Sequence, residues 1–165
     1  MAESTGHEPN IGGFSPTQPG WHEYHVGPTL ICTSKQDCTP QEIADQMARF
    51  AFPGQNPTQP ARNGKIYKVH DPRTELYAGD VSVWISPNGL TTINRTQPNH
   101  VLYDGQIVRV AARDKSGSWY VTTHGIGNNI TFGMAEANTF QGPPIFRVVD
   151  AKLRQNIDRH HGKQF

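Results

Sequence analysis

The residues best suited to chemistry fall in one stretch, residues 98–129, whose pattern predicts a β-hairpin. Two strand-like segments, residues 106–113 and 118–124, flank a turn with the sequence Asp-Lys-Ser-Gly. Side chains alternate between the two faces of a strand, and directly opposed residues of an antiparallel pair share a face. If Arg113 pairs with Ser118, one face carries four polar side chains, Arg109, Tyr120, Thr122 and His124. A shift of one residue in register would separate them.

This polar face has the composition of a site that cleaves RNA without a metal. Attack by the 2′-hydroxyl of RNA needs a base, an acid and a cation that stabilises the charged phosphorane. Histidine transfers protons near neutral pH, and arginine binds phosphate through paired hydrogen bonds. We assign base and acid to His100 and His124, the cation to Arg109, and a hydrogen bond to the phosphate to Thr122 or Tyr120. The alternative is an ordinary solvated sheet face, on which the same residue types are common.

Basic and aromatic residues alternate along the predicted strands, a combination that suits single-stranded RNA. The candidates for substrate contact are Arg95, Lys68 and Trp119. Asp104 and Asp114 lie among these residues and reduce the net positive charge of the patch. His100 precedes its strand, so the loop that carries it must fold toward the polar face for the site to form.

Composition sets broad bounds on the fold. A chain of 165 residues fits one domain with its own core, and 16 glycines with 13 prolines indicate many turns. The net charge of +1 neither requires nor excludes a nucleic-acid partner. The chain has no run of eighteen apolar residues, so we expect no membrane span. The N-terminus lacks a basic region followed by an apolar one, so we expect no classical signal peptide.

The elements that must position the hairpin are two helices and further strands. Thr39 and Glu42 form a capping box with Pro40 at the first helical position, which predicts a helix starting at Thr39. Strand-like segments follow at residues 65–70, 81–85 and 90–96, and the Asn88-Gly89 sequence predicts a hairpin turn between the last two. A last helix, with a buried stripe of Phe146, Val149, Leu153 and Ile157, is predicted at about residues 145–157, after a Gly-Pro-Pro sequence. The fold class is therefore α+β, with an N-terminal helix, a four- to five-stranded antiparallel sheet and a C-terminal helix.

We divide the chain into three parts. Residues 1–28 contain four prolines and five glycines and are predicted to form a flexible N-terminal arm or linker. Residues 29–158 form a single catalytic domain, and residues 159–165 form a basic tail. His22, Glu23 and His25 lie in the arm, but a metal site needs further ligands, so we predict a solvated loop there. We expect neither a metal nor a cofactor.

The two cysteines, Cys32 and Cys38, leave two alternatives open. They form a reduced pair if the chain stays in the cytosol, or a small disulfide loop if it is exported. The bridge would tie the segment before the first helix to that helix.

The runs T-Q-P-N-H-V-L-Y-D-G-Q-I-V-R-V and G-S-W-Y-V-T-T-H-G-I-G-N resemble the C-terminal toxin domains of bacterial polymorphic toxins. These domains are cargo of Rhs, contact-dependent inhibition and type VI secretion effectors. The upstream I-C-x5-C-T and the downstream P-P-I-F-R-V-V-D extend the resemblance over roughly residues 24–157. The order of helix and antiparallel sheet is similar to the ribonuclease group that includes barnase, EndoU, a nuclease colicin and RelE-type toxins.

The resemblance implies a metal-independent ribonuclease that is secreted or delivered into the cytoplasm of a target cell. It also implies a cognate immunity protein that blocks the site, and we expect the free chain to be monomeric. The His, Arg and Thr positions of that group fall on His100, Arg109, Thr122 and His124. The chain departs from the group in lacking a clear glutamate base in the sheet and a strongly basic charge.

Two other functions remain open. The first is a toxin that consumes NAD⁺, as a glycohydrolase or ADP-ribosyltransferase, for which Glu136 is the only late glutamate. The second is a binding module without enzymatic activity.

Overall fold

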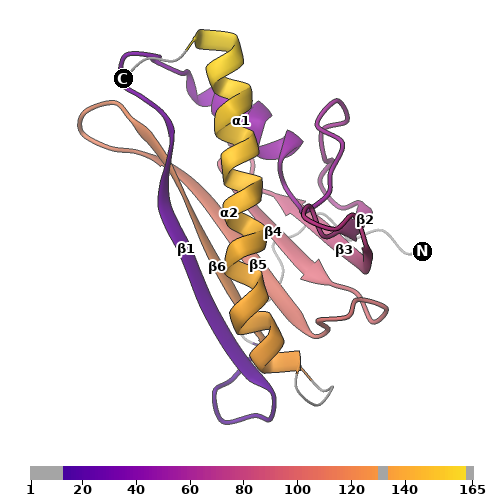
Figure 1. Cartoon of the computed structure of the whole chain (residues 1–165). Coiled ribbons are helices and arrows are strands. Elements are labelled where there is room, and N and C mark those ends of the chain that lie inside the picture. The colour runs from indigo at the N-terminus through magenta and orange to yellow at the C-terminus, as the bar shows by residue number, and fades with distance from the viewer. Residues whose placement is uncertain (1–12, 130–133, 163–165) are drawn as a thin grey trace.

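Six strands and two helices make up the described part of the chain. The computed structural model describes residues 13–129 and 134–162, without the side chains of residues 134–140. Its elements are β1 (Trp21–Cys32), α1 (Pro40–Arg49), β2 (Ile66–His70), β3 (Tyr77–Ile85), β4 (Thr91–Thr96), β5 (Gly105–Arg113), β6 (Trp119–Asn128) and α2 (Met134–His161). The strands form one antiparallel sheet in the order β1-β6-β5-β4-β3-β2 (Figure 1).

The long helix α2 lies across one face of this sheet, which we name the covered face (Figure 1). Its buried stripe of Phe146, Val149, Leu153 and Ile157, predicted from the sequence, packs on apolar side chains of β1, β5 and β6. We name the opposite surface the open face. It carries the partly or fully exposed side chains of β1, β5 and β6, which include Glu23, His25, Val108, Val110, Tyr120, Thr122 and His124.

The predicted fold class is wrong in two respects. The sheet has six strands instead of four or five, and the first element is the strand β1 instead of a helix. β1 begins at Trp21, inside the stretch that we assigned to an arm, and its burial alternates as in a half-buried strand. Gly27 and Pro28 concealed this alternation, because they form a bulge where the register shifts between Val26 and Thr29.

The C-terminal helix is also longer than predicted. α2 is one helix of 28 residues, and Pro143 and Pro144 lie inside it. Gly142 is needed for packing, because a Cβ atom at this position would lie 2.5 Å from the Tyr24 ring. The Gly-Pro-Pro sequence therefore marks a close contact with β1 instead of a helix boundary. Residues 159–161 of the predicted tail form the last turn of α2, whereas residues 1–12 and 163–165 lie outside the described residues.

The capping box and the cysteine pair fix the entry to α1. The Thr39 hydroxyl accepts a hydrogen bond of 3.1 Å from the Glu42 amide, so the predicted cap is confirmed. Cys32 and Cys38 form a disulfide, which ties the end of β1 to the start of α1.

The core has two apolar clusters. One joins α1 and α2 to β1, β5 and β6, and the other joins β2 and β3 to the segment that follows α1.

Among the described residues, no helix combines the length and apolar character needed to cross a membrane.

Candidate functional site

The β5–β6 hairpin that carries the predicted site has a different register from the predicted one. Arg113 pairs with Trp119 instead of Ser118, and Arg109 pairs with Thr123. The predicted register is therefore wrong by one residue. Because neighbouring residues of a strand point to opposite faces, this single step divides the predicted polar face between the two sides of the sheet.

The turn explains the register. Asp114 donates its amide hydrogen to the Ser118 carbonyl at 2.9 Å, and the Gly117 amide bonds back to the Asp114 carbonyl at 3.1 Å. Gly117 has a φ of 95°, a conformation that favours glycine. This is a three-residue loop with a glycine bulge, in which Asp114 and Ser118 already pair. The predicted register treats all four turn residues as loop, which places every partner one residue too early.

Arg109 lies on the covered face and is completely buried. Its guanidinium donates to Asp150 Oδ1 on α2 at 2.6 Å, to Thr123 Oγ1 on β6 at 3.3 Å, and to the carbonyl oxygen of Phe50. Both Arg109 and Asp150 are 0% exposed. Arg109 therefore joins the sheet to both helices and has no access to a substrate, so its predicted role as the catalytic cation is wrong.

The other three hairpin residues remain together on the open face. Tyr120 and His124 are partly exposed and Thr122 is exposed. His124 lies directly opposite His25 of β1, and the two rings stack with centroids 4.3 Å apart. The sequence prediction does not include His25 as a neighbour, because it assigns residues 1–28 to an arm and not to a strand of the sheet.

The predicted substrate contacts have three different environments. Trp119 is buried on the covered face, where its indole nitrogen donates to the Cys38 carbonyl at 3.0 Å, so a stacking role on a substrate is wrong. Arg95 is paired with Asp104 at 3.1 Å, with the Phe14 ring 4.5 Å from its guanidinium carbon. Lys68 is exposed on β2.

His100 lies apart from the hairpin residues, in the loop between β4 and β5, and lines a cavity below the N-terminal half of α2. The cavity measures about 330 Å³ and is bounded by β1, β2, β3, β4, β5 and α2 and by residues of three loops. Its apolar lining includes Tyr24, Val69, Ala78, Val81, Ile107, Ile145 and Phe146. These residues come from both apolar clusters, so the cavity lies between the two parts of the core.

Three polar groups of the lining have a hydrogen-bonding position that no described residue fills. His100 Nδ1 accepts a hydrogen bond of 3.0 Å from the Leu102 amide, so in the neutral ring the hydrogen lies on Nε2. Asn94 donates to the Ala51 carbonyl at 2.8 Å, but its Oδ1 is buried without a partner. The Tyr24 hydroxyl completes the set, and burial raises the pKa of Tyr24.

Two histidines of the cavity lining, His22 and His100, have lowered pKa values. Burial lowers the pKa of His100 from 6.5 to about 4, and the nearby charge of Asp80 opposes this effect only in part. Burial also lowers the pKa of His22, although a hydrogen bond with the Gly20 backbone opposes it. Burial therefore favours the uncharged imidazole of both residues.

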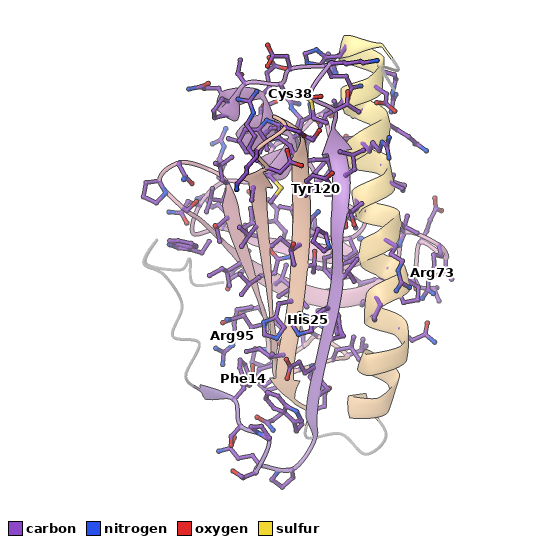
Figure 2. All side chains as sticks on the ribbon, turned by 90° about the vertical axis from the view of Figure 1, so that its left-hand side faces the viewer. Phe14, His25, Cys38, Arg73, Arg95 and Tyr120 are labelled. Atoms are coloured by element: carbon purple, nitrogen blue, oxygen red, sulfur yellow. A yellow bond between two sulfur atoms is a disulfide. The ribbon has the colours of Figure 1, made fainter. Side chains whose placement is uncertain are left out.

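At the mouth of the cavity, hydrogen bonds of Arg73 connect the loop after β2 to α2, and exposed apolar side chains lie on the adjoining loops. Arg73 donates two hydrogen bonds to Asp71, at 3.1 and 2.9 Å, and a third of 3.0 Å to Gln141 at the start of the described side chains of α2. Figure 2 shows Arg73 beside α2. Leu76 and Val101, two of the most exposed large apolar side chains in the described chain, belong to the adjoining loops.

The cavity could not be read from any motif. Its walls come from segments between His22 and Phe146, and only His100 among the predicted residues belongs to it. The available signal in the sequence was the alternation along β1, in which every second residue from His22 to Val26 is buried.

No protein-family model and no curated protein matches the sequence. Among solved structures, the solution structure of the Aha1 dimer from Colwellia psychrerythraea is similar with a TM-score of 0.47 and 14% identity, over 79% of this chain and 94% of that chain. The crystal structure of protein CV1439 from Chromobacterium violaceum has a TM-score of 0.42 and 11% identity, over 83% of this chain and 99% of that chain. Similarity at this level carries no functional argument, and the toxin resemblance stays a prediction.

Proposed function

We propose that the protein binds a small, neutral and largely apolar molecule in the cavity between the sheet and α2. The observation that carries this proposal is the cavity itself, whose apolar walls hold a few polar groups without internal partners. This combination is typical of small-molecule sites, which usually start at about 300 Å³. A volume of about 330 Å³ equals that of roughly eleven water molecules at about 30 Å³ each, so the ligand has on the order of ten non-hydrogen atoms.

The polar groups favour a ligand with one hydroxyl or carbonyl group. His100 Nε2 offers a hydrogen, Asn94 Oδ1 accepts one, and the Tyr24 hydroxyl does either. A charged ligand would have to leave water for an apolar space in which Arg73, the only arginine among the described lining residues, already pairs with Asp71. A neutral ligand avoids this desolvation cost.

A fluorescent probe of matching size and polarity tests the proposal. We expect 2-naphthol, a neutral bicyclic alcohol, to bind the wild-type chain with a 1:1 stoichiometry. Ala78→Leu adds apolar volume inside the cavity and is expected to weaken binding at least tenfold. Val110→Leu, on the open face, is the matched control and should leave the affinity unchanged.

Two results would contradict the binding proposal. One is equal affinity of the wild type and Ala78→Leu, with circular dichroism showing that both are folded. The other is an absence of saturable binding for 2-naphthol and for a panel of neutral aromatic and aliphatic alcohols up to millimolar concentration.

We keep the metal-independent ribonuclease as a second candidate, because the open face supports it. Tyr120, Thr122 and His124 share that face, and His25 adds a second imidazole that can serve as the acid or the base. RNA would then be the substrate and an immunity protein the partner. Arg95, paired with Asp104, would supply the cation in place of Arg109.

Incubation with total RNA in the presence of EDTA tests this candidate. Cleavage that survives EDTA and is lost in His124→Ala, but not in the α2 control His160→Ala, supports a ribonuclease. Intact RNA with wild-type protein rejects it. A parallel incubation with NAD⁺ tests the NAD⁺-consuming alternative, which intact NAD⁺ would reject.

A further inference from the structure

Two histidines and a glutamate converge on the open face, on the side of the sheet away from the cavity. His25 of β1 and His124 of β6 are directly opposed, and Glu23 lies two residues before His25 on the same face. Both imidazole Nε2 atoms lie 3.1 Å from Glu23 Oε1. Figure 2 shows His25 projecting from β1 away from α2, on the side where Arg95 and Phe14 also lie.

These three side chains have the spacing of ligands around one metal ion. Zn²⁺ binds imidazole nitrogen and carboxylate oxygen at about 2.1 Å, which places adjacent ligand atoms about 3 Å apart at angles between 90° and a tetrahedral angle. The two distances of 3.1 Å to Glu23 Oε1 match this spacing, and all three ligand atoms lie within 4.8 Å of one another. The backbone of the paired strands fixes this arrangement without any contribution from a loop.

The rings have room to turn toward a shared ion. Their planes differ by only 6°, so the two Nε2 lone pairs point side by side instead of at one point. The side chains of His25, Glu23 and His124 are 60%, 41% and 37% exposed, so no packed neighbour prevents a small rotation of one ring. An ion held by three such ligands keeps open positions for water.

The charges around the cluster favour a cation. Glu23 contributes a carboxylate whose Oε1 lies within hydrogen-bonding distance of both imidazoles. On β5, the residue paired with His124 is the uncharged Val108. Arg95 lies in the same cross-strand row as Glu23 but three strands away, about 14 Å at the usual strand spacing, and it is paired with Asp104.

We propose that Glu23, His25 and His124 form an exchangeable binding site for one divalent transition-metal ion of the Zn²⁺, Ni²⁺ or Cu²⁺ type. Two imidazoles and one carboxylate suit these ions, whereas Mg²⁺ and Ca²⁺ prefer oxygen ligands alone. The site is independent of the cavity, because the sheet separates the two. A second group, Cys38 with Glu42 and His161, is not a comparable site, because its cysteine is held in the disulfide.

Titration of the untagged full chain with ZnCl₂ in a calorimeter tests the proposal. The wild type is expected to bind one ion. His25→Ala and His124→Ala are each expected to weaken binding at least tenfold, since even the loss of an outer hydrogen-bond partner costs about that much. His160→Ala removes an exposed histidine of α2 and should leave the affinity unchanged. MgCl₂ in excess should not compete.

Paramagnetic broadening locates the ion without relying on affinity. We expect Cu²⁺ to broaden first the amide signals around His25 and His124. Broadening centred on the C-terminal end of α2 would overturn the proposal. So would wild-type affinity for Zn²⁺ in a folded His25→Ala/His124→Ala double variant, or no Zn²⁺ binding at millimolar concentration. Because both histidines are exposed, circular dichroism is expected to show the variants folded.

Discussion

Two arginine–aspartate pairs lie on opposite faces of the same sheet. They consist of the same residue types but differ in distance and in exposure to solvent. Arg109 and Asp150, on the covered face, are 2.6 Å apart and 0% exposed. Arg95 and Asp104, on the open side, are 3.1 Å apart, with side chains 29% and 26% exposed. The first pair joins strands to helices, whereas the second remains in contact with solvent. Residue type alone therefore does not distinguish an arginine that holds the fold together from an arginine that a substrate can reach.

The histidines repeat this contrast. His100 is buried beside the cavity and its pKa is lowered to about 4, so it is a neutral hydrogen-bonding group. His124 stays on the open face, in contact with Glu23 and His25. The covered face thus supports ligand enclosure, and the open face supports chemistry with solvent, ions or a large substrate.

The largest expected effect tests the two arginine pairs against each other. Arg109→Ala leaves Asp150 buried without a partner and is expected to lower the free energy of unfolding by about 3–5 kcal/mol. Arg95→Ala breaks a partly exposed pair and should cost less than about 1 kcal/mol. Urea unfolding monitored by circular dichroism measures both. Equal losses in the free energy of unfolding for the two variants would show that the two pairs do not differ in their contribution to stability.

A double replacement sharpens this result. Arg109→Met combined with Asp150→Leu removes both charges, and is expected to be much less destabilising than Arg109→Ala alone, because no buried charge is left unpaired. If the double variant is as unstable as the single one, the hydrogen bonds to Phe50 and Thr123 matter more than the charge pair.

The second effect is a dependence of stability on pH that originates in His100. Its pKa is about 4 in the folded chain and 6.5 in the reference state, so the unfolded chain takes up a proton first as the pH falls. Its contribution is fully present above pH 6.5 and is lost progressively toward pH 4. The loss reaches roughly 3 kcal/mol, since each unit of pKa difference corresponds to about 1.4 kcal/mol.

Unfolding curves between pH 7 and pH 4 measure this effect. The His100→Gln variant should lose less stability than the wild type over that interval, and His160→Gln should behave like the wild type. Parallel curves for the wild type and His100→Gln would show that the ring is not buried as described.

The disulfide is expected to contribute less. Cys32 and Cys38 are six residues apart in sequence, and closing so short a loop stabilises a chain by about 2 kcal/mol. The Cys32→Ala/Cys38→Ala variant should lose that amount in urea unfolding without a change in affinity for 2-naphthol. A loss of ligand affinity would show that this end of β1 shapes the cavity.

The smallest effect belongs to the open face. Thr122→Ala changes an exposed side chain without a described partner and should alter the free energy of unfolding by less than about 0.5 kcal/mol. If the ribonuclease candidate holds, the same substitution reduces RNA cleavage. A destabilisation of more than 1 kcal/mol would mean that this part of the face is covered.

Local signals in the sequence were sufficient for local structure. The capping box at Thr39 and the Asn88-Gly89 turn identified α1 and the β3–β4 hairpin, because both depend on bonds within a few residues. The stripe of Phe146, Val149 and Leu153 likewise identified the buried side of α2.

The pairing of strands that are distant in sequence could not be predicted from local sequence signals. β1 pairs with β6, about a hundred residues away, and nothing local marks this partnership. The β5–β6 register depended on whether Gly117 counts as loop or bulge, and that single choice determined the face on which Arg109 lies. The cavity depends on all of these pairings at once, so it became visible only in three dimensions.

The bulge at Gly27 and Pro28 also has a consequence for self-association. β1 is the last strand on its side of the sheet, and its outer amides and carbonyls are a potential template for a strand from another molecule. Pro28 has no amide hydrogen to offer, and the register shift between Val26 and Thr29 breaks the row of backbone groups. An incoming strand would find only two short, misaligned segments, so this border of the sheet is poorly suited to fibril growth.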